Sequence, residues 1–237
     1  MDEREQHLFD ELRAAGKIYG AIEPERFKTF EVKRIDRAIL ADLRKVEDLT
    51  CELSDALDRL GYRMGRCTVS GGEIRPLSPE FRAVGTAITQ RTCPERIRKD
   101  EPSAKMKSRM SVRDVPWYAE EDDVWVVDAK GCPYSHFGEI AAKNMQAHKL
   151  AGTILDGVMR DTETIKRIGY PIWCRGNTPL SGMGRVDTVE INGTVTIGGV
   201  QVRPGDLVAA DANGLCFVPA ELVNEVYAEL KNSHVIQ

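Results

Sequence analysis

Apolar residues repeat at helical spacing after residue 46. The repeat comprises Leu49, Leu53, Leu57 and Leu60. It stops at Gly61, and glycine commonly follows the last turn of a helix, so the pattern predicts an amphipathic helix that buries one face. Residues 1–45 are more charged and favour helix over residues 3–15 and 34–45. We therefore divide the chain into an N-terminal helical arm, residues 1–45, used in assembly, and a main domain, residues 46–237.

Two short continuous apolar runs, residues 124–128 and 153–156, each end in an acid. Such runs are typical of strands that are buried on both faces and whose carboxyl ends open onto a site. A helical segment, residues 139–149, separates them, and this spacing predicts a parallel β-α-β unit. A second helix over Thr162–Ile168, which ends at Gly169, and a strand over residues 172–174 extend it.

The regions before and after this β-α-β unit have different sequence patterns. Residues 67–94 combine β-branched residues with repeated glycines and predict short strands and turns. Residues 95–114 are strongly basic, and we interpret them as a solvated surface excursion. From residue 186 onward, turn residues, among them Asn192-Gly193, alternate with short apolar strands until a closing helix over residues 219–231, a pattern that predicts antiparallel pairing. The pattern as a whole predicts an α/β domain with a mixed sheet.

Composition narrows the class of protein. With 237 residues, 42% hydrophobic and 30% charged, the chain is expected to fold around one main core. The net charge of −4 argues against nucleic acid as a partner. The charged N-terminus and the lack of a long apolar run predict a soluble, cytoplasmic protein with no membrane partner. The six cysteines stand singly and are expected to be reduced and structural.

Candidate chemistry lies where the predicted strands end, because open α/β sheets bind ligands at that edge. The turn at Gly138 is expected to leave the amides of Glu139, Ile140 and Ala141 unpaired at a helix N-terminus, which favours an anion such as a carboxylate. Arg160 can complete this anion site, because its guanidinium matches a carboxylate with two hydrogen bonds. These residues are predicted to hold the carboxylate of an α-keto acid.

Carboxylates in the same region predict a metal site. Asp161 and Glu139 supply hard oxygen ligands, directly or through water, of the kind that Mg²⁺ or Mn²⁺ takes while keeping several waters. Each residue also has a structural interpretation. Asp161 can cap the helix that follows it, Glu139 can complement a helix dipole, and Arg160 can form a surface ion pair.

Other possible sites have less support. Cys132 and His136 have the spacing of a metal pair, but no further ligand stands near them in the sequence, and we favour structural roles for both. The chain contains neither a glycine-rich phosphate loop nor a GxSxG motif, which argues against nucleotide-dependent and serine-hydrolase chemistry.

The candidate residues also form a recognisable pattern: Gly138-Glu139, twenty intervening residues, then Arg160-Asp161. This split motif resembles the signature of the 4-hydroxy-4-methyl-2-oxoglutarate / 4-carboxy-4-hydroxy-2-oxoadipate aldolase family, which shares its fold with the regulator of RNase E activity. Residues 54–58 and 198–206 are similar to that family as well, so the resemblance covers about residues 46–230.

The resemblance implies a swivelling β/β/α sandwich (RraA-like fold) that assembles as a homotrimer or as a homohexamer made of two trimers, with sites at subunit interfaces. It implies that Asp161 ligates the divalent metal, that Arg160 holds the pyruvyl carboxylate and steadies the enolate, and that Glu139 holds a water ligand of the metal. It also implies that the amides of Ile140 and Ala141 bind carboxylate.

Three features depart from the family pattern. Glu139 stands where the better-known aldolases carry Asp, residues 129–136 replace a glycine-rich segment, and no C-terminal acid matches the one that reaches a neighbour's site.

The function that we expect is class II cleavage of a 4-hydroxy-2-oxo acid to pyruvate with Mg²⁺ or Mn²⁺, together with decarboxylation of oxaloacetate. The intact Arg160-Asp161 pair carries this expectation. Two alternatives remain open: a lyase or dehydratase of the same fold that acts on a sugar-acid-derived keto acid, and a non-catalytic binding protein like the RNase E regulator.

Overall fold

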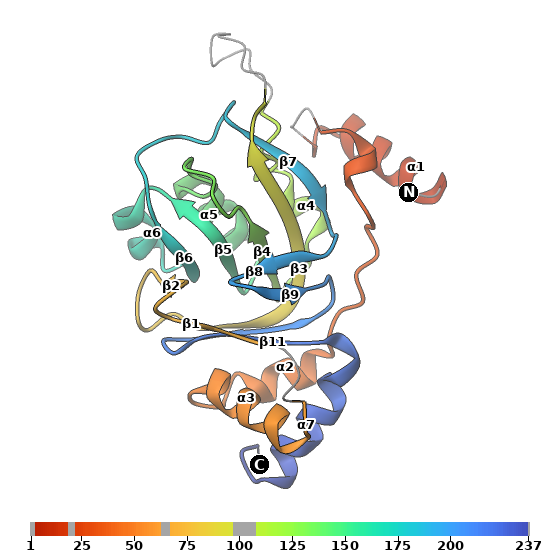
Figure 1. Ribbon diagram of the computed structural model, residues 1–237. Coiled ribbons are helices and arrows are strands. Elements are labelled where there is room, and N and C mark those ends of the chain that lie inside the picture. Colours follow the sequence, from red (N-terminus) through yellow and green to blue (C-terminus); the bar gives the residue numbers. More distant parts are fainter. Residues whose placement is uncertain (1–2, 19–21, 63–66, 97–107, 237) are drawn as a thin grey trace.

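The computed structural model describes residues 3–18, 22–62, 67–96 and 108–236 of the chain. Its main feature is a mixed sheet with helices on more than one side (Figure 1). In spatial order the hydrogen-bonded strands are β1 (Thr68–Ser70), β11 (Gly214–Val218), β10 (Leu207–Ala210), β3 (Ala83–Pro94), β4 (Asp123–Asp128), β5 (Gly152–Met159), β6 (Ile172–Asn177) and β2 (Arg75–Pro76). Strand β7 (Val186–Ile191) pairs with β3, and β8 (Val195–Ile197) with β9 (Val200–Val202) form a separate hairpin.

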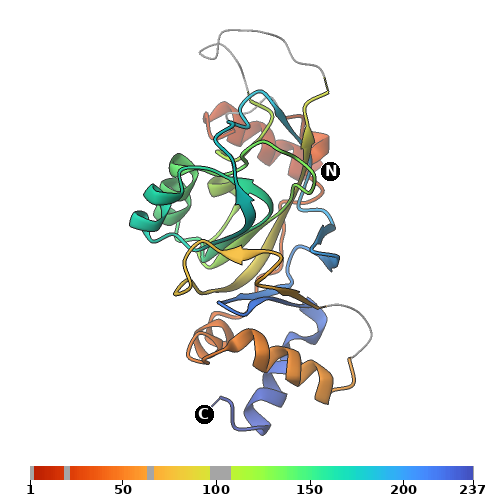
Figure 2. The same cartoon turned by 60° about the vertical axis from the view of Figure 1, so that its left-hand side comes forward.

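The helices fall into separate groups. The α-helices are α1 (Glu3–Ala14), α2 (Arg37–Leu43), α3 (Leu49–Arg59), α4 (Val115–Tyr118), α5 (Glu139–Ala147), α6 (Thr162–Ile168) and α7 (Val223–Asn232), with 3-10 turns at Pro24–Arg26 and Ala220–Leu222. Helices α2, α3 and α7 gather beside β1 and β11, whereas α5 and α6 lie on another side of the sheet (Figures 1 and 2). No helix in the described part of the chain is long and apolar enough to cross a membrane.

The predicted parallel unit is confirmed. Strands β3, β4, β5 and β6 pair in parallel, with α5 between β4 and β5 and α6 between β5 and β6. The acids in the two apolar runs have structural contacts, however. Asp156 lies within β5, fully buried, and pairs with Arg175 of β6, while Asp128 accepts a hydrogen bond from the amide of Thr196 at 3.2 Å. The site therefore lies beyond them along the chain.

The expectation of only short strands between residues 67 and 94 is wrong for β3, which runs over 12 residues. Its polar residues are buried because each finds a partner in another element. Thr89 Oγ1 donates to the Gly193 carbonyl at 2.5 Å, and Gln90 Nε2 donates to Thr188 Oγ1 at 2.7 Å. Burial of a paired polar group costs far less than burial of an unpaired one, so the strand continues through them.

The C-terminal third is antiparallel as predicted, but the turn at Asn192-Gly193 is not a hairpin turn. Strand β7 before it pairs with β3, whereas β8 after it pairs with β9. The Asn192 side chain instead accepts from the Thr89 amide and donates to the Thr29 carbonyl. The turn thus fixes the crossing of the chain from the sheet to the β8–β9 hairpin.

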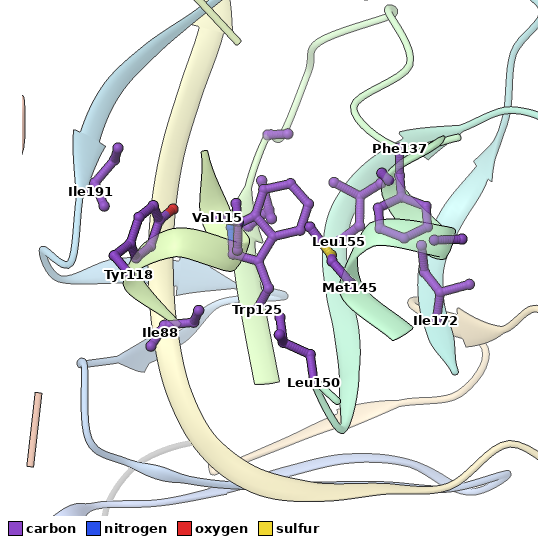
Figure 3. Close-up of a cluster of buried hydrophobic side chains, with 14 of the residues drawn as sticks. Ile88, Val115, Tyr118, Trp125, Phe137, Met145, Leu150, Leu155, Ile172 and Ile191 are labelled. Carbon is purple, nitrogen blue, oxygen red and sulfur yellow. The ribbon is translucent and has the colours of Figure 1, made fainter. Parts of the chain in front are cut away.

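The core consists of three clusters of buried apolar side chains. One lies between the sheet and helices α4–α6 and includes Trp125, Phe137, Met145 and Leu155 (Figure 3). Buried residues of the N-terminal region join this cluster, among them Phe9, Ile22, Phe27 and Phe30. The second cluster lies beneath the β8–β9 hairpin, and the third joins the sheet to α2, α3 and α7. Assembly through the region of residues 1–45 stays a prediction.

All six cysteines are free thiols, as predicted. The basic excursion, residues 95–114, lies only partly within the described residues, because residues 97–107 fall outside them. Of the remainder, Ser111 and Asp114 are buried, and Arg109 forms ion pairs with Glu23 and Asp187. Residues 108–114 are therefore anchored to the domain through Arg109, Ser111 and Asp114, although Arg113 is exposed.

Candidate functional site

The residues predicted for the site line one hollow at the carboxyl ends of β4 and β5. Gly138, Glu139, Ile140 and Ala141 reach it from the start of α5, and Arg160 and Asp161 reach it from the link between β5 and α6. Its volume is about 80 Å³. A larger hollow, of about 410 Å³, lies at the opposite ends of the parallel strands and contains none of these residues.

Asp161 connects the two helices that border the hollow. Its backbone is left-handed (φ 63°, ψ 34°) at the N-cap position of α6, yet its side chain forms no capping hydrogen bond with that helix. The carboxylate turns instead to α5, where Asp161 Oδ2 accepts a hydrogen bond from the Glu139 amide at 3.0 Å. The prediction that the Glu139 amide is unpaired is therefore wrong, because the N-terminus of α5 already attracts this carboxylate.

Gly138 is required by the close approach of Asp161. A Cβ at this position would lie 2.6 Å from Asp161 Oδ2 and 3.4 Å from Arg160 Cγ. The Gly138 backbone itself is extended (φ −159°), a conformation open to any residue. The glycine thus serves to leave space for the carboxylate rather than to permit an unusual backbone.

Arg160 lies beside the same carboxylate, with Nε 3.5 Å from Asp161 Oδ2. Its backbone amide donates to the Phe137 carbonyl at 3.0 Å, which joins the end of β5 to the loop before α5. Glu139 also lines the hollow, and its Oε1 accepts a hydrogen bond from Lys143 Nζ at 2.5 Å, one helical turn further along α5. Both acids are thus held by neighbouring cations or amides and project from fixed backbone positions.

Two further amides of α5 are suited to anion binding. Ile140 and Ala141 stand in the first turn, where a helix offers no carbonyl partner to its amides. The Ala142 amide is the first to enter the helical pattern, donating to the Gly138 carbonyl at 3.1 Å. The amides of Ile140 and Ala141 and the Arg160 guanidinium therefore border one hollow, an arrangement that can bind a carboxylate.

His136 and Cys132 do not form a metal pair. Both side chains are buried, and the His136 ring is bonded on both sides, to Thr92 Oγ1 at 2.8 Å and to the Tyr134 carbonyl at 2.9 Å. Burial lowers the pKa of His136 to about 4, only partly offset by the bond to the Tyr134 carbonyl, so the ring is neutral at physiological pH. His136 supports the wall of the hollow as a structural residue.

The donor set suits a magnesium-like ion that keeps most of its own water. In the described part of the chain, no three His, Cys, Asp or Glu side chains gather closely enough to hold a metal by themselves. Asp161 and Glu139 nevertheless project into one open hollow. Mg²⁺ is commonly held by one or two carboxylates with water and substrate oxygens, rather than by a complete protein cage. The residues present fit that kind of site.

Several lining residues were missed by the sequence analysis. Met110, Val112 and Arg113 come from the segment before α4, and Ser181–Met183 come from the link between β6 and β7. A bridge between Ser135 and Ser181 brings the second segment to the loop before α5. No local motif marks these residues, since only the tertiary fold places them at the hollow.

Known proteins resemble this chain in sequence. The family model RraA-like (Aldolase/RraA) matches residues 50–217. A protein of Halalkalibacterium halodurans named "Putative 4-hydroxy-4-methyl-2-oxoglutarate aldolase" is 32% identical over 171 residues, which cover 72% of this chain and 71% of that protein. Protein DlpA of Legionella pneumophila is 30% identical over 180 residues, 75% of this chain; the match spans only about a quarter of its length (27%).

Solved structures support the same fold. Streptomyces coelicolor RraAS2, described as an unusual member of the RNase ES inhibitor RraA protein family, aligns with a TM-score of 0.68 at 24% identity over 86% of this chain and 96% of its own. This likeness confirms the expected α/β, RraA-like fold. With the family model and the Halalkalibacterium halodurans relative, it shows that the chain belongs to the RraA-like (Aldolase/RraA) family.

Proposed function

We propose that this protein is a divalent-metal-dependent lyase that cleaves a 4-hydroxy-2-oxo acid and releases pyruvate. The observation that carries the proposal is the meeting of Asp161, Glu139 and Arg160 at one hollow, with Asp161 Oδ2 held by the Glu139 amide. The aldolase name of the relative in Halalkalibacterium halodurans agrees with this chemistry.

Substrate binding follows from the cations and amides around the hollow. The substrate's C1 carboxylate binds the amides of Ile140 and Ala141 and the Arg160 guanidinium, which supplies a charge that persists at any working pH. Arg160 thereby also stands next to the negative charge that develops when the carbon–carbon bond breaks. A fixed cation at that position lowers the energy of the transition state.

Asp161 is the residue that would hold Mg²⁺ or Mn²⁺ directly, with Glu139 acting through water. When bound, the ion supplies Lewis-acid polarisation of the substrate's 2-oxo group. The close packing of Gly138 against Asp161 Oδ2 fixes the direction of this carboxylate. A ligand that is already oriented loses less conformational entropy on binding.

Cleavage requires removal of the proton from the substrate's 4-hydroxyl group. Glu139 is the carboxylate at the hollow that can accept it, directly or through water, and the contact of Lys143 Nζ with Glu139 Oε1 orients the side chain. As the proton leaves, the C3–C4 bond breaks, C4 becomes a carbonyl, and the electron pair passes to the pyruvate enolate. Protonation of this enolate at C3 gives pyruvate. Decarboxylation of oxaloacetate passes through the same enolate, so we include it as a second activity.

A rim of exposed apolar side chains supports the further proposal that the chain assembles as a trimer or as two trimers. Ile140, which lines the hollow, is 55% exposed. Leu180, which directly precedes Ser181 in the chain, is 47% exposed. Burial of such side chains by another copy is favourable. Size-exclusion chromatography with light scattering tests the assembly, and a monomer at micromolar concentration would contradict it.

Pyruvate release tests the proposed reaction. Purified protein is given 4-hydroxy-4-methyl-2-oxoglutarate or oxaloacetate, with Mg²⁺ or with chelator, and pyruvate is followed with lactate dehydrogenase. We expect activity that needs the ion and that is lost in Asp161→Ala. Glu163→Ala is the matched control, because Glu163 is an exposed acid two positions away that forms an ion pair with Lys166.

Failure of both substrates, while oxalate still binds in the presence of Mg²⁺, would keep the site and assign it another keto acid, such as one derived from a sugar acid. Absence of both turnover and oxalate binding would contradict the proposal. It would favour a non-catalytic role of the kind named for the RNase ES inhibitor family.

A further inference from the structure

Arg113 lines the same hollow as Arg160 and Asp161, although it lies far from them in the sequence. Its side chain is exposed, and among the described residues no hydrogen bond, ion pair or ring contact involves the guanidinium. Because no acid in the described part of the chain pairs with Arg113, its positive charge at the hollow can be matched by a ligand.

Hydrogen bonds hold the backbone on either side of Arg113. Residues 111–114 form a tight turn that is closed by the Asp114 amide, which donates to the Ser111 carbonyl at 3.0 Å. Ser111 Oγ donates to Asp114 Oδ2 at 2.6 Å, and both residues are buried. Because the turn is anchored on either side of Arg113, only the side chain itself is ordered when a ligand binds.

Neighbouring arginines have structural partners. Arg109, four positions earlier, pairs with Glu23 at 2.9 Å and with Asp187 at 2.9 Å. Arg185 donates to the Ser181 carbonyl at 2.8 Å. These contacts account for the two neighbouring arginines as parts of the fold, whereas no residue in the described ranges makes such a contact with Arg113.

The charges around the hollow indicate what Arg113 binds. In the proposed reaction, the substrate's C1 carboxylate is matched by Arg160 and the amides of α5. Arg113 is then the remaining arginine among the described residues that line the hollow, and Met110, Val112 and Met183 beside it offer no polar side-chain partner. A ligand carboxylate at Arg113 therefore meets no competing polar side chain from these three residues.

We infer that Arg113 binds a second carboxylate on the substrate and thereby selects 4-hydroxy-2-oxo dicarboxylic acids over monocarboxylic ones. The inference rests on the proposed function and adds to it the residue that recognises the substrate's second carboxylate. A planar guanidinium fits a carboxylate through two parallel hydrogen bonds, which a lysine at the same position cannot reproduce.

Two substrates that differ in one group test the inference. In 4-hydroxy-4-methyl-2-oxoglutarate C4 carries a carboxylate, and in 4-hydroxy-4-methyl-2-oxopentanoate it carries a methyl group in its place. The first yields two pyruvates and the second yields pyruvate and acetone. We expect Arg113→Met to lower kcat/KM for the dicarboxylate by about 10-fold to 100-fold, the range of a charged hydrogen bond. The monocarboxylate should change by less than about threefold, and Arg113→Lys should recover part of the loss.

Arg82→Met is the matched control, since Arg82 is also exposed and lies at the other hollow, at the opposite ends of the strands. Calorimetric titration with oxalate should give the same affinity for wild type and Arg113→Met, because oxalate occupies the C1 carboxylate and 2-oxo positions only. Equal losses on both substrates, or none on either, would overturn the inference and leave the proposed function intact. Absence of pyruvate from both substrates together with absence of oxalate binding would refute the proposed function, and this inference with it.

Discussion

Substitution of Gly138 by alanine adds one methyl group between the start of α5 and the side chains of Arg160 and Asp161. The new Cβ would lie 2.6 Å from Asp161 Oδ2, about 0.8 Å inside the 3.4 Å at which ordinary contact begins. Because the Gly138 backbone is extended, alanine adopts it without strain. The carboxylate of Asp161 must therefore move, and the 3.0 Å hydrogen bond from the Glu139 amide is lost or lengthened.

The size of the effect follows from that hydrogen bond. A hydrogen bond to a charged group contributes about 1.5–3 kcal/mol, which corresponds to a change of about 10-fold to 150-fold in an equilibrium or rate constant. We expect Gly138→Ala to weaken Mn²⁺ binding and to lower kcat/KM for pyruvate release by a factor in this range. Stability should change by less than about 1 kcal/mol, because alanine also restricts the unfolded chain.

The assay is a titration with Mn²⁺ followed by calorimetry, together with thermal unfolding of the same samples. Gly176→Ala is the control, since a Cβ at Gly176 of β6 meets nothing within 4 Å. Full metal affinity and full activity in Gly138→Ala would refute the argument that Asp161 must keep this position. A large loss of stability in Gly138→Ala would show instead that the glycine serves the fold.

Three further predictions concern single side chains. Asp161→Asn keeps the shape but removes the charge, so pyruvate release should fall at least about 100-fold with an unchanged melting temperature; retained activity would contradict the role of Asp161. His136 has a folded-state pKa of about 4, against about 6.5 when unfolded, and the unfolded chain therefore binds the extra proton first. The free energy of unfolding should be level above pH 6.5 and fall by about 3 kcal/mol towards pH 4, and a urea titration of wild type and His136→Gln that gave identical pH slopes would refute this. Asp156→Asn removes the charge that pairs with Arg175, whose side chain is 31% exposed, and should cost about 1.5–3 kcal/mol in chemical unfolding, where a loss below about 0.5 kcal/mol would contradict it.

The parallel part of the fold was predictable because local pattern and tertiary environment agree there. Residues 124–128 form a continuous apolar run and lie in β4, whose first five residues are all buried. Helix α6 begins at Thr162 and ends at Ile168, before Gly169 in the left-handed conformation, as its C-terminal glycine predicted. In such segments the hydrophobic period alone identifies the element.

Strand β3 was not predictable in the same way. Its buried residues include Thr86, Thr89, Gln90 and Thr92. Their hydroxyl and amide groups are satisfied by distant residues: for example, Thr86 Oγ1 accepts from the Ile35 amide at 3.1 Å. A sequence pattern predicts that a polar residue is exposed, because the pattern carries no information about hydrogen-bond partners that lie many residues away.

Part of the site was likewise predictable from the sequence, and part was not. The spacing of Glu139 and Arg160-Asp161 placed them at neighbouring strand ends, and the structure brings them to one hollow. Whether Asp161 would cap its own helix or turn to another could not be decided, since both uses satisfy a helix N-terminus. Arg113 was missed because its place at the hollow depends on the turn that buries Ser111.

Binding of Mn²⁺ tests the central claim most directly. The electron paramagnetic resonance signal of the free ion disappears on binding, so a titration with wild type, Asp161→Ala and Glu163→Ala measures the site without turnover. The account predicts binding that oxalate strengthens in wild type and in Glu163→Ala, and that Asp161→Ala abolishes. Equal binding of Mn²⁺ by Asp161→Ala and wild type, with no effect of oxalate, would contradict it.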